Sequence, residues 1–431
     1  MKNLNFLLLY VLLICSCVNK PTQPNQRPDQ VHEKKDTIQQ APRIKVYMEN
    51  SGSMDGYVKG ATDFENAVYS YLSDLQLADL GEKFDSTSFK NVLELNYINS
   101  QVLKQKSDVQ AFIKELEPDA FRIRGGKRGA SDMSNILDTI FNHADYSKDV
   151  SILISDCIFS PGKQYKTKDN ADDYLVSQQI GIKSHIVEQI THFPDFSIVV
   201  LRLISQFNGN YYNKYDDKTS INETRPFYIW LMGNRRQLKR ILNEVDVAYI
   251  KGSGVQNIYM ASNPVKSIPY GILPAQSIGK FKPDPNNPKT SIKNAEVDKK
   301  AGNSCFQLAI GIDYSQMLLS DAYLTDVSNY EISNKAYSID IAKNKNPNSS
   351  YTHILRLNLN EPIISRGTVK ISLKNVLPSW INEYTDNNGL DIHADGAMKK
   401  TYGLKFLLGG VYEAYSSEKD NCHSVITVNI K

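Results

Sequence analysis

The sequence lacks the residue pairs and loops that usually mark zinc sites, nucleotide-binding sites and hydrolases. Its 431 residues include only 5 Cys and 7 His, and none of these form a His-x-x-x-His or Cys-x-x-Cys pair. Without such pairs, the commonest structural and catalytic zinc sites have no ligands. No Gly-x-Ser-x-Gly elbow and no Gly-Lys-Ser/Thr loop occurs, which argues against an α/β-hydrolase and a P-loop protein.

An excess of charge of one sign is also missing. The 50 Lys and Arg residues nearly balance the 47 Asp and Glu residues, the net charge is +3, and no long basic run occurs. Nucleic acid is therefore a poor candidate partner. A hydrophobic fraction of 41% is ordinary for a globular protein, and 431 residues are enough for two or three domains that each bury a core.

The apolar run at the N-terminus is too short to span a bilayer as a mature helix. Residues 6–14 are apolar and follow the basic Lys2, which is the pattern of a signal peptide. The letters ICSC after this run resemble a bacterial lipobox, which predicts a signal peptide over residues 1–16 and lipidation of Cys17. An ordinary secretory signal with incidental cysteines is the open alternative.

Residues 17–42 are rich in Pro, Gln, Lys and Asp and contain few apolar side chains that could be buried. This composition predicts a disordered tether that holds the folded part off the membrane. Val18, and not Asp, follows the cysteine that we expect to carry lipid. By resemblance to bacterial sorting rules, this favours a lipid-anchored protein of the cell envelope, on the outer membrane and facing the periplasm.

Three cysteines follow the tether, and three cannot all pair with one another. Cys305 and Cys422 both lie in the last third of the chain and could form one disulfide in an oxidising compartment. Two buried free thiols are the open alternative. Cys157 ends a strongly apolar, strand-like segment, so we expect it in the core.

After the tether, strand-like segments alternate with amphipathic helical ones. Residues 44–49 read as a short strand, and residues 63–78 place their apolar side chains on one helical face. This alternation predicts a three-layer, doubly wound α/β domain over residues 43–262. Two strand-like runs flank a polar loop in residues 205–234, which predicts a hairpin-like excursion from the alternating pattern.

The pattern changes after this domain. Residues 263–303 contain many Pro, Asn and Lys residues with little periodicity, which predicts a linker or an irregular connection. Short strand-like segments then recur at a spacing typical of a β-sandwich. Residues 304–431 are therefore expected to form a mainly β, sandwich-like domain with one late helix, over residues 401–415.

Polar side chains follow two of the predicted buried strands. Glu49, Ser51 and Ser53 alternate at the end of the first strand, and Asp156 ends the letters ILISD. Ser131 follows a Gly-rich loop that opens a helix. Because ligands of an open α/β sheet gather at the carboxyl ends of its strands, we expect these five side chains at one rim of the sheet. Hard oxygen ligands of this kind suit Mg²⁺ or Mn²⁺.

The predicted α/β domain resembles a von Willebrand factor A domain, whose metal-ion-dependent adhesion site uses an Asp-x-Ser-x-Ser loop, a Thr and an Asp. The letters ENSGSM match the first loop as Glu49, Ser51 and Ser53, while Ser131 stands for the Thr and Asp156 for the Asp. Two departures are the extra methylene of Glu49 and the missing methyl group of Ser131. The resemblance implies a metal ion that binds an acidic residue of a partner protein, and no enzyme activity.

Three other interpretations stay open. The letters SGS can form a plain turn and helix N-cap, with Glu49 solvated and Asp156 capping a helix. The domain can be a metal-free scaffold that binds through its surface, in which case substitution of Ser51 leaves binding intact. A hydrolase of envelope polymers would use Asp156 or Glu49 as acid or base, and it predicts a deep cleft with a carboxylate pair instead of a shallow rim.

Overall fold

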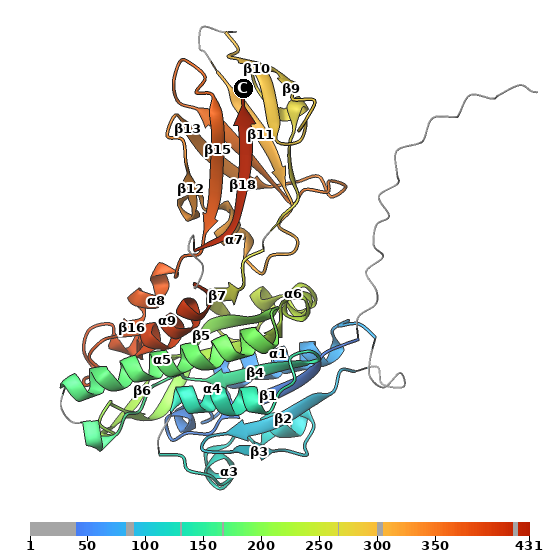
Figure 1. Ribbon diagram of the computed structural model, residues 1–431. Coiled ribbons are helices and arrows are strands. Elements are labelled where there is room, and N and C mark those ends of the chain that lie inside the picture. Colours follow the sequence, from blue (N-terminus) through green and yellow to red (C-terminus); the bar gives the residue numbers. More distant parts are fainter. Residues whose placement is uncertain are drawn as a thin grey trace, which may run out of the picture. The chain divides into compact units, whose positions relative to one another are not determined.

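The structure of the protein is a computed structural model that describes residues 40–82, 90–129, 132–165, 168–265, 267–299, 305–416 and 421–431. Gln40–Lys431 form one structural unit (Figure 1). The expected signal peptide, Cys17 and nearly all of the expected tether lie outside the described residues, as does Ser131. Among the helices of the described part, none combines the length and the apolar character needed to cross a membrane.

A seven-stranded sheet forms the centre of the N-terminal part (Figure 1). Its strand order is β3-β2-β1-β4-β6-β5-β7. The strands are β1 (Arg43–Glu49), β2 (Leu93–Ile98), β3 (Val102–Lys104), β4 (Asp149–Ser155), β5 (Phe196–Tyr212), β6 (Lys218–Asn234) and β7 (Val255–Ser262). Strand β1 pairs in parallel with both β2 and β4, so the carboxyl ends of β1 and β4 lie at the same edge of the sheet.

Helices cover both faces of this sheet. They are α1 (Asp63–Leu77), α2 (Val109–Lys114), α3 (Pro118–Arg122), α4 (Met133–Asn142), α5 (Lys168–His192) and α6 (Arg235–Glu244). Val46 and Met48 of β1 belong to the apolar cluster that includes α1, whereas Tyr47 belongs to the cluster that includes α4 and α5. Because successive side chains of a strand point to opposite faces, this alternation places a helical layer on each face of a mixed α/β fold.

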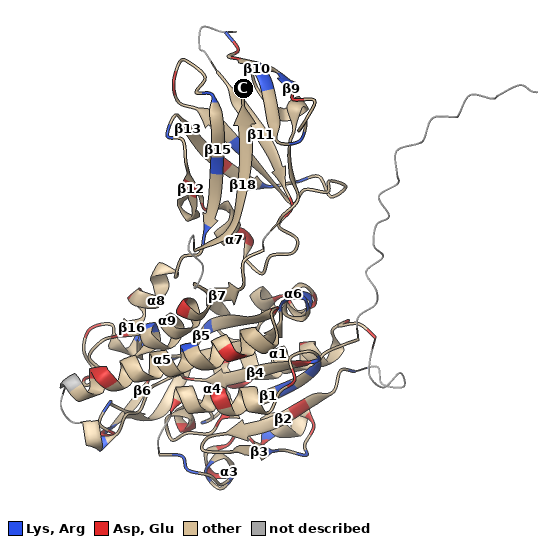
Figure 2. Ribbon diagram, viewed as in Figure 1, with Lys and Arg blue, Asp and Glu red and all other residues tan. Residues whose placement is uncertain are grey.

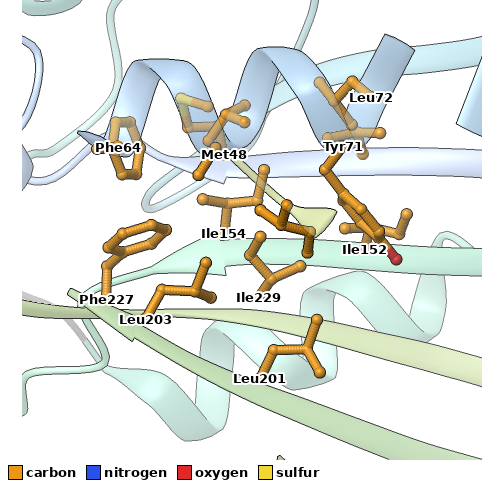
Figure 3. Close-up of a cluster of buried hydrophobic side chains, with 14 of the residues drawn as sticks. Met48, Phe64, Tyr71, Leu72, Ile152, Ile154, Leu201, Leu203, Phe227 and Ile229 are labelled. Carbon is orange, nitrogen blue, oxygen red and sulfur yellow. The ribbon is translucent and has the colours of Figure 1, made fainter. Parts of the chain in front are cut away.

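The apolar core under α1 positions the loop that carries the first residues of the candidate site. Figure 3 shows Tyr71 of α1 reaching toward Ile152 of β4 and Met48 of β1 pointing toward α1, and all three residues are fully buried. Burial of a side chain of this size contributes about 1.5–3 kcal/mol to folding. The core therefore holds α1 against β1 and β4, and with it the loop that connects β1 to α1.

Beyond β4 the sheet differs from a doubly wound parallel sheet. Strand β6 pairs antiparallel with both β4 and β5, and β5 pairs antiparallel with β7. Strands β5 and β6 form one long hairpin, and its second strand lies between β4 and β5. The last pair between β4 and β6 is Ser155 with Tyr228. The hairpin therefore extends past the carboxyl end of β4, where the candidate site lies.

Two further sheets form the C-terminal part, and both contribute to one apolar core. Their strand orders are β12-β15-β18-β10-β9 and β13-β14-β11-β8. The strands are β8 (Tyr270–Ile272), β9 (Lys280–Pro283), β10 (Ser291–Glu296), β11 (Gln307–Ile312), β12 (Tyr330–Ile332), β13 (Tyr337–Lys343), β14 (His353–Leu359), β15 (Gly367–Lys374) and β18 (Cys422–Ile430). The helix α7 (Asp321–Thr325) precedes β12, and its first turn is acidic, which Figure 2 shows in red.

The expected linker over residues 263–303 is not a linker, because three strands of these sheets, β8, β9 and β10, lie within it. Strand β8 has only 3 residues and β9 only 4. An alternation of apolar and polar residues cannot be recognised over so few positions, and the turns between the strands contain the Pro and Asn residues that suggested irregular structure.

The expected late helix does not pack within the β-rich part. The segment between β15 and β18 contains α8 (Ser379–Glu383), β16 (Thr385–Asp386), β17 (Thr401–Tyr402) and α9 (Leu404–Tyr415). Leu404 and Leu407 of α9 share an apolar cluster with Ile182 of α5. A Cβ atom on Gly410 would lie 2.7 Å from the backbone oxygen of Gln179, so the two helices are in close contact. The unit expected over residues 304–431 is thus divided: its strands form the C-terminal sheets, and α9 packs on the N-terminal part. The sequence does not show this, because an apolar helical face does not specify which surface it meets.

Cys305 and Cys422 do not form the disulfide considered above. Cys422 begins β18 of the five-stranded sheet, opposite Lys374 of β15. Cys305 lies just before β11 of the four-stranded sheet, where its backbone pairs with that of Asp298. Cys422 thus lies in a strand of the five-stranded sheet, whereas Cys305 lies outside the named strands. Cys157 is fully buried, in agreement with the core position expected for it.

Candidate functional site

The loop after β1 brings two serine hydroxyl groups together. Ser51 Oγ and Ser53 Oγ lie 2.9 Å apart, and the two side chains belong to buried residues. Met54 N donates a hydrogen bond of 3.3 Å to Ser51 O, a turn that places both hydroxyl groups on one side of the loop. Two oxygen ligands in adjacent octahedral positions around Mg²⁺, each at about 2.1 Å, lie roughly 3.0 Å apart, so the spacing fits one edge of a Mg²⁺ coordination shell.

Asp156 follows β4 directly and is 1% exposed. Its Oδ1 accepts a hydrogen bond of 3.3 Å from Ile158 N, and its Oδ2 has no hydrogen-bond partner among the described residues. Burial raises the pKa of Asp156 and the charge of Glu49 raises it further, against the opposing effects of the nearby Ser53 hydroxyl group, the backbone N–H of Ile158 and the charge of Arg225. The carboxylates of Asp156 and Glu49 thus place two acidic groups close together in a buried position, and a cation would compensate their charge.

Glu49 ends β1 and is 1% exposed. Ser155, the last residue of β4, donates a hydrogen bond to Glu49 Oε2, and Ser155 Oγ accepts one of 2.7 Å from Cys157 N. The carboxylate of Glu49 is therefore held against the neighbouring strand. Ser155 was not predicted as a site residue, and its only signal in the sequence is a hydroxyl group at the end of an otherwise apolar strand.

Arg128 joins the Gly-rich loop before α4 to the loop after β1. Its Nε donates a hydrogen bond of 2.9 Å to Asn50 Oδ1, and its Nη2 donates one of 2.9 Å to Ser51 O and another to Asp55 Oδ1. In the opposite direction, Gly52 N donates a hydrogen bond of 3.0 Å to Arg128 O. The two loops are thus held together by both backbone and side-chain bonds.

A pocket of about 60 Å³ opens beside the two serines. It is lined by Ser51, Gly52, Ser53, Arg128, Gly129, Ile158, Ser160, Tyr212 and Asp216. Tyr212 and Asp216 come from the end of the hairpin formed by β5 and β6, and a Cβ atom on Gly52 would lie 3.2 Å from the Tyr212 hydroxyl oxygen. Neither residue was expected at the site, because nothing local to the hairpin indicates that it extends over the end of β4.

The backbone changes direction between Asp156 and the residues that line the pocket. Cys157 has a φ of 55°, in the left-handed region that residues other than Gly rarely adopt. Such conformations persist where the surrounding structure holds them, and they are common at functional sites. Here the change separates the buried Asp156 from Ile158 and Ser160, which line the pocket.

Four of the five predicted metal ligands lie at the two adjacent strand ends. Ser51 and Ser53 line the pocket, whereas Glu49 and Asp156 are buried and are not among its lining residues. The fifth, Ser131, lies outside the described residues. Within the described part, no group of three His, Cys, Asp or Glu side chains could hold a metal ion, so a cation here would depend on the serine hydroxyl groups. The hydroxyl pair and the Oδ2 atom of Asp156 fit a hard cation such as Mg²⁺ or Mn²⁺.

No family model, no curated protein and no solved structure matches this chain. The function therefore has to be inferred from the chemistry of the site itself, beginning with the hydroxyl pair of Ser51 and Ser53 beside the buried Asp156.

Proposed function

We propose that the protein is a lipid-anchored component of the cell envelope and binds a partner protein through a divalent metal ion. On this proposal Ser51 and Ser53 hold Mg²⁺ or Mn²⁺ directly, and Ser131, Asp156 and Glu49 hold it directly or through water. An acidic side chain of the partner completes the coordination shell. The metal ion supplies positive charge for binding, and no reaction is catalysed.

One combination of features carries the proposal. Two hydroxyl oxygens lie 2.9 Å apart on the wall of a pocket, next to a carboxylate of which one oxygen has no hydrogen-bond partner among the described residues. Buried carboxylate oxygens normally have hydrogen-bond partners, so an exception calls for an explanation such as an ion. Oxygen ligands of low total charge are those that Mg²⁺ accepts together with water molecules.

The arrangement of β1, β2 and β4 supports the resemblance to a von Willebrand factor A domain. The three strands are parallel, helices cover both faces of the sheet, and the candidate ligands follow β1 and β4. The antiparallel strand β6 departs from the doubly wound sheet that the resemblance implies. This departure affects the strands beyond β4 and leaves the two strand ends of the candidate site side by side.

The positions of the carboxylates favour binding over hydrolysis. A hydrolase would present Glu49 or Asp156 to its substrate, because a general acid or base must lie within hydrogen-bond reach of the reacting group. Both residues are 1% exposed, and neither is among the described residues that line the pocket. A pocket of about 60 Å³ has room for about four groups the size of a water molecule, which suits an ion with a few ligands.

A metal-free scaffold is the second candidate, and one observation favours it. The groups of the site also bond to each other without an ion, since Ser51 Oγ and Ser53 Oγ share a hydrogen bond and Ser155 donates to Glu49. A site that is satisfied internally can serve as a rigid surface for a partner. Substitution of Ser51 would then leave the binding of the partner unchanged.

Calorimetric titration of the full-length protein with Mg²⁺ and with Mn²⁺ tests the main proposal. We expect the wild-type protein to bind either ion and the double variant Ser51→Ala/Ser53→Ala to lose this binding. The matched control is Ser197→Ala, because Ser197 is also buried but lies on β5 and donates a hydrogen bond to Asp195 O. Absence of binding in the wild-type protein would contradict the proposal and leave the scaffold as the better account.

A further inference from the structure

The turn between β5 and β6 places a carboxylate on the wall of the pocket beside the two serine hydroxyl groups. Asp216 lies in this turn and lines the same pocket as Ser51 and Ser53. Its φ of 62° lies in the left-handed region, which Asp and Asn adopt more readily than most other residues. The backbone is thus held in an uncommon conformation where the hairpin places an acidic side chain on the pocket wall.

The position of Asp216 is determined by bonds within the turn and from outside it. Asp216 N donates a hydrogen bond of 2.9 Å to Asn213 O, and Asp217 N donates one of 3.0 Å to Asn213 Oδ1. From outside the turn, Gly389 O accepts a hydrogen bond of 2.9 Å from Lys214 N. The turn is therefore an ordered part of the site and is held against the segment between β15 and β18.

Ser160 joins the carboxylate of Asp216 to the loop that follows β4. The hydroxyl group of Ser160 donates a hydrogen bond of 2.6 Å to Asp216 Oδ1, and both residues line the pocket. This bond involves one of the two carboxylate oxygens. The bond orients the Asp216 side chain against the same loop that begins with Asp156.

The charges around the pocket favour a cation next to Asp216. Of the described residues that line the pocket, only Arg128 is basic, and its guanidinium group is already bonded to Asp55 and to the loop of Ser51. Asp156 adds a buried carboxylate close to the same loop. A carboxylate and two hydroxyl groups on one pocket wall are oxygen ligands of the kind that a divalent cation such as Mg²⁺ accepts together with water molecules.

On the basis of the proposed metal site, we propose that Asp216 is a ligand which the chain itself supplies to the metal ion. It occupies the position that an acidic side chain of the partner would otherwise take. Partner binding then requires displacement of the turn between β5 and β6. The hairpin regulates the site, because the metal ion is held more tightly, and the partner more weakly, while Asp216 is bound.

Substitution of Asp216 with a matched control at Asp217 tests this inference. Asp216→Asn keeps the size of the side chain and suits the left-handed backbone, and Asp216→Gly removes the oxygen ligands while it tolerates the same φ. The controls are Asp217→Asn and Asp217→Gly, because Asp217 is exposed and does not line the pocket. We expect the Asp216 variants to bind Mn²⁺ at least about tenfold more weakly than the wild-type protein, and the controls to match it.

The relaxation rate of water protons on the Mn²⁺-loaded protein gives a second readout. Loss of an internal ligand opens a position for water, so we expect a higher relaxation rate per bound ion in Asp216→Gly than in the wild type. Equal affinities and equal relaxation rates would overturn the inference, while loss of binding in Ser51→Ala/Ser53→Ala would still uphold the proposed function. A wild-type protein that binds no Mn²⁺ would overturn both.

Discussion

Arg128 and Ser51 are bonded across two loops, since Nη2 of Arg128 donates a hydrogen bond of 2.9 Å to the backbone oxygen of Ser51. The side chain of Arg128 is 18% exposed, so this bond is partly shielded from water. Hydrogen bonds to a charged donor are stronger than neutral ones, by about a factor of two. The guanidinium group thus fixes the backbone that carries the two serine hydroxyl groups.

Replacement of Arg128 by Ala is expected to weaken metal binding without removing a predicted ligand. We expect the affinity for Mn²⁺ to fall about 10- to 100-fold, because groups that orient metal ligands have effects of this size. Calorimetric titration measures the change. The control is Arg122→Ala, since Arg122 also bonds to Asp55 but its side chain is 54% exposed. Equal affinities for the Arg128 variant and the wild type would show that the loop keeps its shape without the bond.

Arg225 is expected to stabilise the contact between the hairpin and the segment that follows β15. It is 2% exposed, lies 5.0 Å from the ring centre of Tyr211, and its Nη1 donates hydrogen bonds of 3.2 Å to Ala397 O and 3.1 Å to Met398 O. Arg225→Ala removes the donors, and we expect it to lower the free energy of unfolding by about 2–4 kcal/mol. Urea denaturation measures this loss.

The exposed Arg366 in the β-rich part provides the control for Arg225. Arg366→Ala removes the same side chain from a surface position, where a change within about 0.5 kcal/mol is usual. If both variants unfold at the same urea concentration, Arg225 does not hold the segment between β15 and β18 in place.

His423 is expected to make the protein less stable in acid. It is 5% exposed, and burial lowers its pKa to about 4. Because the pKa of an unfolded His is about 6.5, the neutral buried form favours folding above that pH, and this contribution is lost as the pH falls toward the folded pKa. We expect about 2–3 kcal/mol of unfolding free energy to disappear between these two pH values.

Urea denaturation at several pH values, on the wild type and on His423→Phe, measures the contribution of His423. The variant keeps an aromatic ring beside Tyr323, whose ring centre lies 5.7 Å from that of His423, and it cannot gain a proton. The wild type should lose more stability than the variant between neutral pH and about pH 4. Parallel pH profiles would mean that His423 is protonated as easily in the folded protein as in the unfolded one.

The local elements and the loop of the candidate site were predictable from the sequence. Strand β1 and helix α1 follow from the spacing of their apolar residues. The positions of Ser51, Ser53 and Asp156 at adjacent strand ends follow from the parallel pairing expected of alternating strands and helices. The strand and the helix depend on residues close together in the chain, and the parallel pairing follows from the alternation of strands and helices along it.

The composition of the pocket wall was decided by the tertiary structure. Tyr212 and Asp216 reach the pocket because β6 lies between β4 and β5, and Ser155 holds Glu49 because the two strands pair in one register. The helix α9 packs on α5 although the β-rich part surrounds it in sequence. An apolar pattern in the sequence indicates that a side chain is buried. Which surface that side chain packs against depends on the apolar area buried by the whole chain, and residues far apart in the sequence contribute to that area.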